Sequence, residues 1–229
     1  MSVESHSFWY LENLDMKGIF CPDKMKDQSD HLPVSKVKKG AYVYMQDDSA
    51  DKIYFITEGR IKIGTISNSG KEITKAILSD GEVFGELSLA GVEKRRDYAL
   101  AIEDTIMCIL TRADMKIMLK DHTPLNTFFM NLIGSRALEM ERRLESLVFK
   151  DSRTRVIEFL LDLAKKKGRP VGYETLVRRF MTHQEIANLT ATSRQTVTTI
   201  LNELRNQNIL TFNRRRLLIR DLDKLAAAM

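Results

Sequence analysis

Apolar and polar residues alternate in short runs through residues 36–110. The runs are rich in β-branched and aromatic residues, and turn-forming pairs such as Lys39-Gly40 and Asp80-Gly81 separate them. Short strands that recur about every ten residues between turn signals are typical of a β-sandwich or β-barrel. Glu58-Gly59 marks the clearest hairpin. The predicted strands cover residues 41–45, 52–57, 60–66, 72–78 and 105–110.

The pattern changes to a helical period after Thr111. Residues 112–120 fit a short helix, and Thr123-Pro124 fits the start of a longer one that continues to Phe149. Apolar residues recur along it in steps of three and four, which predicts a single apolar seam. We expect this seam to pair two chains as parallel helices; the alternative is a helix that lies on the barrel. The seam residues are Phe129, Ile133, Ala137, Met140, Leu144 and Leu147.

A candidate hinge at residues 149–152 separates the long helix from a third, amphipathic helix at residues 152–168. This helix has three lysines in its last turn, where cations oppose the negative end of the helix dipole, and Gly168-Arg169-Pro170 then ends it. The following residues, 171–180, fit a strand or an irregular connection.

Residues 181–210 predict two short helices joined by a tight turn. Thr182 caps the first helix, and Glu185 completes a capping box. Thr192 or Ser193 caps the second helix, and the small Ala187 lets the two helices approach closely. This arrangement is a helix-turn-helix.

Residues 209–221 alternate as two strands around a run of three arginines, which predicts a β wing beside the helix pair. An isolated helix-turn-helix pattern is often an ordinary helical hairpin, but the charge of this region favours DNA binding. Residues 150–229 contain 16 Lys and Arg against 8 Asp and Glu, whereas residues 1–149 contain 20 and 23. Basic side chains release counterions from DNA, and polar ones reach phosphates and base edges. The candidate DNA-binding residues are Thr182, His183, Ser193, Arg194, Gln195, Thr196, Thr198, Thr199, Arg214, Arg215 and Arg216.

The composition of the chain argues against a membrane protein, a metal or haem protein and an enzyme. No run approaches the ~18 apolar residues of a membrane span. Cys21 and Cys108 are too few for an iron–sulfur cluster, and sparse cysteine usage is typical of a cytoplasmic protein. His6, His31 and His122 lie in no recognisable haem-ligand motif, and we expect neither a metal site nor catalytic residues.

The stretches QEIANLTATSRQTVTTILNEL and DGEVFGELSLAGVEKRRDYALA resemble the family of the cyclic-AMP receptor protein and the FNR regulators. The resemblance covers nearly the whole chain. It implies an α+β fold with an N-terminal β jelly-roll of the cyclic-nucleotide-binding type, a long dimerisation helix and a C-terminal winged helix-turn-helix. The expected domains are an effector-sensing domain at residues 1–122, the dimerisation helix at 123–149 and the DNA-binding domain at 150–229.

The family's base-reading pattern resembles S-R-E-T-V-x-R, and here the stretch begins at Ser193. Arg194 matches, whereas Gln195 replaces an acid and Thr199 replaces a second arginine. Because an amide can donate where a carboxylate cannot, the resemblance implies a different half-site. If Thr192 is the N-cap, Gln195 can instead fold back as its capping-box partner. Ala191 stands where the family commonly has glycine, so a positive φ at this residue would carry steric strain.

In the family a Gly-Glu-Leu cassette holds a cyclic phosphate, with a glutamate on the ribose and an arginine on the phosphate. Asp97 replaces a serine there and would repel a phosphate unless Arg95 or Arg96 neutralises it. Met140 stands at an adenine-contacting threonine and cannot make that hydrogen bond. Cyclic AMP, another small acidic ligand and no ligand all stay open as alternatives. The candidate effector residues are Gly85, Glu86, Leu87, Ser88, Arg95, Arg96, Asp97 and Met140.

The sequence therefore predicts a homodimeric transcription regulator that reads a palindromic double-stranded DNA site under control of a small-molecule effector. An activator would also contact RNA polymerase. The alternative is a cyclic-nucleotide-binding regulatory module that does not read DNA.

Overall fold

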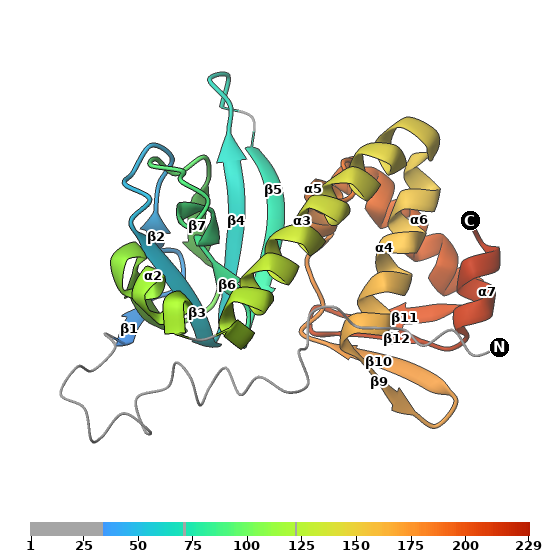
Figure 1. Ribbon diagram of the computed structural model, residues 1–229. Helices are drawn as coiled ribbons and strands as arrows, with labels where there is room; N and C mark the ends of the chain where they lie inside the picture. Colours follow the sequence, from blue (N-terminus) through green and yellow to red (C-terminus); the bar gives the residue numbers. More distant parts are fainter. Residues whose placement is uncertain (1–33, 71, 122) are drawn as a thin grey trace. The chain divides into compact units, whose positions relative to one another are not determined.

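The computed structural model describes residues 34–70, 72–121 and 123–229, and it divides the chain into two compact units (Figure 1). The first unit extends to Ala137, and the second comprises Leu138–Met229. The division falls within one helix, α3 (Thr123–Phe149), so this element belongs to both units. Among the described residues no helix is long and apolar enough to cross a membrane.

The first unit contains two four-stranded antiparallel sheets, in the orders β1-β8-β3-β6 and β2-β7-β4-β5. Buried side chains from both sheets form its core, among them Ile56, Ile61 and Met107. The predicted all-β character of this region and the α+β fold class are confirmed. The strands are β1 (Val34–Val37), β2 (Tyr42–Tyr44), β3 (Lys52–Glu58), β4 (Arg60–Ile66), β5 (Glu72–Ser79), β6 (Val83–Phe84), β7 (Tyr98–Ala101) and β8 (Thr105–Thr111).

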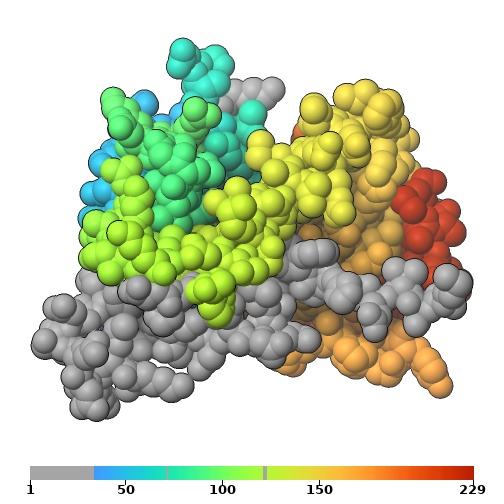
Figure 2. Space-filling model, in the orientation of Figure 1, coloured from blue at the N-terminus to red at the C-terminus, as the bar shows by residue number. Residues whose placement is uncertain are grey.

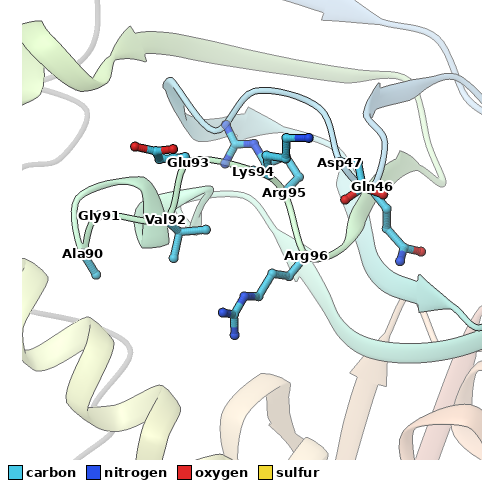
Figure 3. Close-up of a pocket in the computed structure, with 9 residues that line it drawn as sticks. All are labelled: Gln46, Asp47, Ala90, Gly91, Val92, Glu93, Lys94, Arg95 and Arg96. Atoms are coloured by element: carbon cyan, nitrogen blue, oxygen red, sulfur yellow. The ribbon is translucent and has the colours of Figure 1, made fainter.

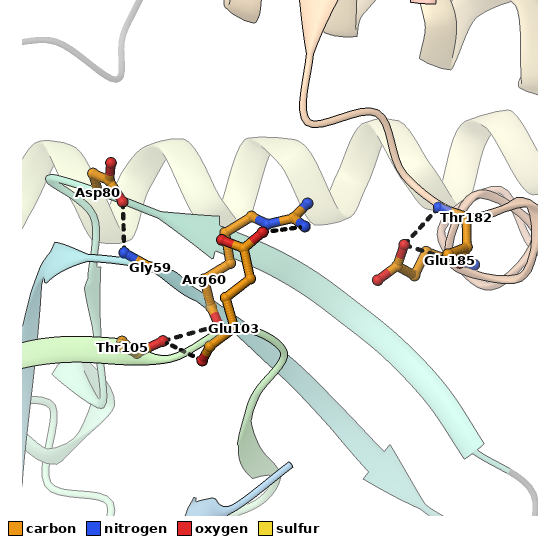
Figure 4. A network of polar contacts seen from close by, with 7 residues as sticks. All are labelled: Gly59, Arg60, Asp80, Glu103, Thr105, Thr182 and Glu185. Atoms are coloured by element: carbon orange, nitrogen blue, oxygen red, sulfur yellow. Dashed lines mark hydrogen bonds and ion pairs between the residues drawn. The ribbon is translucent and has the colours of Figure 1, made fainter. Parts of the chain in front are cut away.

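Gly59 joins β3 to β4 where the sequence predicts the clearest hairpin (Figure 4). Its φ is 103°, and a Cβ atom there would lie 2.5 Å from Oγ1 of Thr105. The Gly59 amide also donates to Asp80 at 2.8 Å. Only glycine combines this backbone conformation with such a close approach.

Helix α2 (Arg112–Asp121) and the first part of α3 cover the sheet that contains β3 and β8. Leu125, Phe129 and Leu132 pack with Ile53 and Cys108 in a buried cluster. The assignment of Phe129 to a dimer seam is therefore wrong, because its ring is 4% exposed within the first unit. The alternative of a helix lying on the barrel is correct for this part of α3.

The rest of α3 presents apolar side chains to solvent. Met140 is 72% exposed and Leu144 is 64% exposed, and atoms of α3 are visible at the surface in Figure 2. Met130, also 72% exposed, stands one position after Phe129 and extends the same row. The exposed row thus runs along Met130, Ala137, Met140, Leu144 and Leu147, with the half-buried Ile133 between its first two members.

The second unit packs helices against one face of a four-stranded antiparallel sheet ordered β11-β12-β10-β9. Val156 and Leu160 contribute to its core with Val177, Leu201 and Leu217. Its further elements are α4 (Ser152–Lys167), β9 (Gly168–Val171), β10 (Glu174–Arg178), α5 (His183–Leu189), α6 (Arg194–Asn206), β11 (Leu210–Phe212), β12 (Arg216–Ile219) and α7 (Leu222–Ala227).

For residues 171–180 the sequence left a strand or an irregular connection open, and the structure has a strand, because β10 (Glu174–Arg178) pairs with β9 in a hairpin. The stop signal at Gly168-Arg169-Pro170 ends α4 as expected, but its residues continue as β9. Pro170 is tolerated there because β9 is an edge strand of the sheet.

Candidate nucleic-acid interface and effector cassette

Helix α5 begins with the predicted capping box (Figure 4). The Thr182 side chain accepts from the Glu185 amide at 3.2 Å, and the Glu185 carboxylate accepts from the Thr182 amide at 2.7 Å. Ile186 and Ala187, on the inner face of α5, are fully buried. The cap and the small buried face fix α5 against α6 as the sequence predicts.

The turn between the helices has a positive φ at Ala191, the position where the resemblance to the family implies that a positive φ would carry strain. This residue has a φ of 49°, a left-handed conformation that usually requires glycine. Ser193 caps α6 by accepting from the Thr196 amide at 3.0 Å. Because Ser193 rather than Thr192 is the N-cap, the alternative in which Gln195 folds back as the capping-box partner of Thr192 is wrong.

Arg155 of α4 ties this turn to the end of the long helix. Its guanidinium donates to the carbonyl of Thr190 at 2.9 Å, of Ala191 at 3.1 Å and of Lys150 at 2.7 Å. One planar group therefore holds three backbone carbonyls, two in the helix-turn-helix and one at the candidate hinge. No local pattern in the sequence indicates this role for Arg155.

Helix α6 presents two kinds of polar side chain. Arg194, Gln195 and Thr199 are exposed, and none has a side-chain hydrogen bond to another described residue. By contrast, the Thr196 hydroxyl bonds that of Ser193 at 2.8 Å, and Thr198 donates to the Arg194 carbonyl at 2.8 Å. The first group is free to contact a partner, whereas the second shapes the helix start.

His183 connects α5, α6 and the wing. Its Nδ1 lies 2.9 Å from the Thr198 hydroxyl, and its ring meets that of Phe212 edge-on at 5.5 Å. Burial, and secondarily the positive charge of Arg194, lowers the pKa of His183 from its ordinary value of 6.5. The side chain is therefore neutral at pH 7 and packs between helix and sheet.

The wing is the loop from β11 to β12. The Asn213 side chain accepts from the amides of Arg215 and Arg216, both at 2.9 Å, and this fixes the turn. Arg214, Arg215 and Arg216 are all exposed. Since Phe212 directly precedes this loop and contacts His183, the three arginines lie beside the helix pair.

Arg178 and Arg179 extend this basic region, although neither was among the residues predicted from the sequence. Both are exposed at the end of β10, and Arg178 is the register partner of Arg216. The signal available in the sequence was the Arg-Arg pair directly before Phe180, but only the register of β10 with β12 places it next to the wing.

The effector cassette forms a single turn of 3₁₀ helix, η2 (Glu86–Ser88), after β6. Gly85 has a φ of 80°, and a Cβ atom there would lie 2.8 Å from the Arg95 guanidinium. Glu86 is 3% exposed and forms an ion pair with Arg136 of α3. Arg136 also donates to the Val83 carbonyl at 2.5 Å, so this side chain of α3 is held at the cassette.

Arg95 is buried inside the cassette. Its guanidinium donates to the Lys52 carbonyl at 2.5 Å and lies 4.3 Å from the centre of the Tyr44 ring. Asp97 accepts from Tyr44 at 3.3 Å and forms an ion pair with Lys75 at 3.2 Å. Lys75, rather than Arg95 or Arg96, is therefore the cation that pairs with Asp97. Burial above all, and then Asp97, raises the pKa of Tyr44 above its ordinary value.

Arg96 borders an open depression of about 710 Å³ between residues 46–47 and 90–96. Figure 3 shows the side chains of Arg95 and Arg96 leaving the chain in opposite directions. Leu87 is 41% exposed, whereas Ser88 is fully buried and its hydroxyl has no hydrogen-bond partner among the described residues. Of the two arginines, only Arg96 is therefore available to an anion from solvent.

Two family models match this chain. The cyclic nucleotide-binding domain matches residues 34–122, and the Crp-like helix-turn-helix domain matches residues 154–228. The chain belongs to the CRP/FNR family. Members of this family are transcription regulators and not enzymes, so this CRP/FNR protein is an effector-controlled, DNA-binding regulator.

Relatives that match most of the chain support its assignment to this family. The chain is 28% identical to the global nitrogen regulator of Synechocystis sp. over 77% of this chain and 80% of the relative. It is 29% identical to the cyclic AMP receptor protein of Thermus thermophilus over 75% and 76% of the two chains. A solved structure of a CooA mutant from Carboxydothermus hydrogenoformans is 26% identical, with a TM-score of 0.74 over 85% and 86%.

Some residues weighed in the sequence fall outside the described part of this CRP/FNR protein. They are His6, Cys21, His31 and His122. Met140, named both for the effector and for the dimer seam, lies in the second compact unit on the exposed row of α3.

Proposed function

We propose that this protein is a homodimer that reads a palindromic operator in double-stranded DNA through α6 and the wing. The observation that carries the proposal is the capped pair α5–α6, whose exposed Arg194, Gln195 and Thr199 stand beside the exposed arginines 214–216. A recognition helix reads base edges with its first turns while nearby basic side chains hold the phosphates.

The side chains on α6 suit particular base edges. Arg194 can donate twice to guanine, and Gln195 can both donate to and accept from adenine. Thr182, Ser193 and Thr196 lie at the helix starts, where hydroxyl groups and backbone amides reach phosphates. In the same proposal Thr198 and His183 support the reading surface from within.

A dimer supplies the second recognition helix, which reads the second half-site of the operator. The exposed apolar row on α3 would pair with the same row of a second chain, and this pairing would hide side chains such as Leu144 from water. Two recognition helices then meet successive major grooves about 34 Å apart. The proposed setting is the cytoplasm, where the protein would reach its DNA.

We propose a small acidic effector at the jelly-roll cassette, with cyclic AMP as the second candidate. The relatives' names include a global nitrogen regulator and a cyclic AMP receptor protein. Here Glu86 already pairs with Arg136 and Asp97 with Lys75, while Arg96 faces the open depression. The effector would shift α3 near Met140 and turn the DNA-binding unit about residues 149–152.

An activator of this design also needs a surface for RNA polymerase. The tip of the β9–β10 hairpin offers Val171, which is 51% exposed, and Tyr173, which is fully exposed. Exposed aromatic side chains commonly anchor protein partners. Under this proposal Tyr173→Ala keeps operator binding but lowers transcription from an activated promoter in vitro.

Selection from random-sequence duplexes, followed by gel shift, tests the DNA proposal. We expect a palindromic site, and Arg194→Ala should weaken its binding about 10- to 100-fold, since a bidentate base contact contributes about 1–3 kcal/mol. Lys165→Gln, an exposed cation on α4, is the matched control and should bind nearly as the parent does. Failure to bind any duplex at low salt would support the regulatory module instead.

Native mass spectrometry of the freshly purified protein, paired with a cyclic-AMP titration, tests the effector. A retained anion whose binding is lost in Arg96→Gln supports the acidic ligand. Tight binding of cyclic AMP that survives Arg96→Gln contradicts it.

A further inference from the structure

The Thr198 hydroxyl group determines which ring nitrogen of His183 carries the proton. Its oxygen lies 2.8 Å from the Arg194 carbonyl oxygen, which can only accept a hydrogen bond. The single hydrogen of the hydroxyl group therefore points to Arg194, as in other threonines that bond back along a helix. The same hydroxyl oxygen lies 2.9 Å from Nδ1 of His183, so Nδ1 must donate to it. The neutral ring thus carries its proton on Nδ1.

The other ring nitrogen of His183, Nε2, is then an unprotonated acceptor. Neutral imidazole has one N–H group, and Nδ1 uses it. Nε2 has no partner in the part of the chain that the structure describes, and it is not buried. Protonation would add a donor at Nε2 and leave the bonds of Thr198 with Nδ1 and with Arg194 as they are. The ring can therefore change its charge without a rearrangement of its surroundings.

One positive charge faces this ring from the elements packed against it. Helix α6 contributes Arg194, which lowers the pKa of His183 in addition to the larger effect of burial. Strand β11 contributes the uncharged ring of Phe212, and the Arg205 guanidinium lies 5.3 Å from the centre of that ring. On α5 itself the Glu185 carboxylate is engaged in the capping box. No described acid forms an ion pair with His183, so the free protein keeps the ring neutral.

We propose that operator binding protonates His183, and that the imidazolium then donates from Nε2 to a phosphate of the DNA backbone. The inference rests on the proposed reading of DNA by α6. The first helix of a helix-turn-helix crosses the backbone while the second lies in the major groove, so a side chain of α5 that contacts α6 stands close to a phosphate. The proton comes from the solvent, and each subunit of the complex gains one positive charge.

A phosphate fits this nitrogen better than a base edge does. An anion beside the ring favours the imidazolium that Arg194 disfavours. The resulting charge-assisted hydrogen bond is roughly twice as strong as a neutral one. A base amino group can instead donate to the neutral Nε2, and this alternative predicts operator binding without proton uptake.

Calorimetry in two buffers of different ionisation enthalpy counts the protons that the selected operator brings into the complex. At about pH 7 we expect roughly 0.5–1 proton per subunit in the parent protein and none at this site in His183→Gln. Between about pH 8 and pH 6 the operator affinity of the parent should rise about 3- to 10-fold relative to that of His183→Gln, since a raised pKa in the complex favours binding as the pH falls. The variant keeps the other histidines of the chain, so the difference between the two proteins belongs to His183.

Thr198→Val tests the proton position, and Thr198→Ser is its matched control. Serine keeps a hydroxyl group that accepts from Nδ1, whereas valine has the shape of threonine without it. Because the imidazolium then lacks an acceptor for one N–H group in a half-buried site, proton uptake should fall in Thr198→Val and be largely retained in Thr198→Ser. Thermal unfolding checks that the variants keep their fold.

NMR of the His183 ring in the parent protein needs no substitution. Nitrogen shifts should place the proton of the neutral ring on Nδ1, and the pKa of His183 should be higher in the operator complex than in the free protein. A proton on Nε2, or an operator complex without proton uptake at His183, would overturn the proposal and leave the proposed function standing. A selection that yields no operator would refute the proposed function and this inference with it.

Discussion

The turn between α5 and α6 holds an alanine in a conformation that suits glycine. Ala191 has a φ of 49°, and its Cβ therefore crowds the backbone. Ala191→Gly should raise the free energy of unfolding of the DNA-binding unit by about 0.5–1 kcal/mol, the relief of strain less the extra entropy of the unfolded chain. Urea unfolding measures the change.

Ala187→Gly is the control on the adjacent helix, because Ala187 is fully buried in α5. It should lower the stability by about 1 kcal/mol, the usual cost of glycine inside a helix. Equal destabilisation by the two substitutions would contradict the assignment of strain to Ala191.

His183 makes the stability of the reading surface depend on pH. Since burial lowers its pKa in the folded state from the ordinary 6.5, the unfolded chain takes up a proton first as the pH falls. The contribution of neutral His183 is complete above about pH 6.5 and is lost as the pH falls toward its folded pKa. Stability curves of the parent and of His183→Gln should therefore converge in acid.

NMR titration of the His183 ring gives the pKa directly. Gln184→Ala, a substitution of the exposed neighbour, should leave the pH dependence as it is in the parent. A His183 pKa at or above 6.5 in the free protein would contradict the packing described for this ring.

Single residues were predictable from sequence where local chemistry decides them. The Thr182–Glu185 box depends on neighbours along the chain, and it was predicted. At Ala191 the resemblance identified a position where a positive φ would carry strain, and the structure has that φ. The contacts of Arg136 and Phe129 were not predicted, because the helical period shows which residues share a side but not which sheet covers it. The DNA-binding roles of Arg194 and Gln195 stay predictions.

At the scale of elements, Arg155 joins α4 to the helix-turn-helix. Arg155→Lys keeps the charge but cannot hold the three carbonyls of Lys150, Thr190 and Ala191 at once. We expect a loss of about 2 kcal/mol, since hydrogen bonds to charged groups contribute roughly 1.5–3 kcal/mol each and lysine recovers part of that. Hydrogen exchange should show faster opening at the Thr192 amide, which donates to Ala187.

Arg153→Lys provides the comparison from the same helix. It alters the contacts of Arg153 with Glu203 and with the Ala228 carbonyl, but touches no residue of the turn. Exchange at Thr192 should stay slow in this variant. The same acceleration in both variants would mean that α4 merely loosens as a whole.

Most of the longer strands were readable from sequence, whereas β1, β6 and β7 were not among the predicted strands. Residues 60–66 alternate, residues 52–57 form an apolar run rich in β-branched and aromatic side chains, and both strands were predicted. β7 (Tyr98–Ala101) contains two alanines, which favour no strand by themselves. It is a strand because Ala99 and Ala101 fit the core between β2 and β4, a tertiary cause that no local pattern carries.

At the scale of the whole molecule, the order of the domains and the positive charge of residues 150–229 could be predicted. Both can be read directly along the chain, one segment after another. The position of Arg178 beside the wing could not be predicted, since Arg178 and Arg216 are far apart in sequence and meet only through strand register. Residue counts show that a segment is basic, but the pairing of strands decides which face of the segment carries the charge.

The dimer is the whole-molecule prediction that the exposed row on α3 supports. Leu144 is 64% exposed, yet it lies in line with Met140 and Leu147 on one side of the helix. In parallel paired helices a carboxylate introduced by Leu144→Glu would meet its own copy, so this substitution should weaken the dimer at least 100-fold, or about 3 kcal/mol. Sedimentation velocity measures the dissociation.

Arg142→Glu introduces the same carboxylate on the opposite side of α3 and should leave the dimer intact. Operator affinity should fall with the dimer, because a monomer presents one recognition helix where the palindrome requires two. A Leu144→Glu protein that stays dimeric would show that another surface joins the chains.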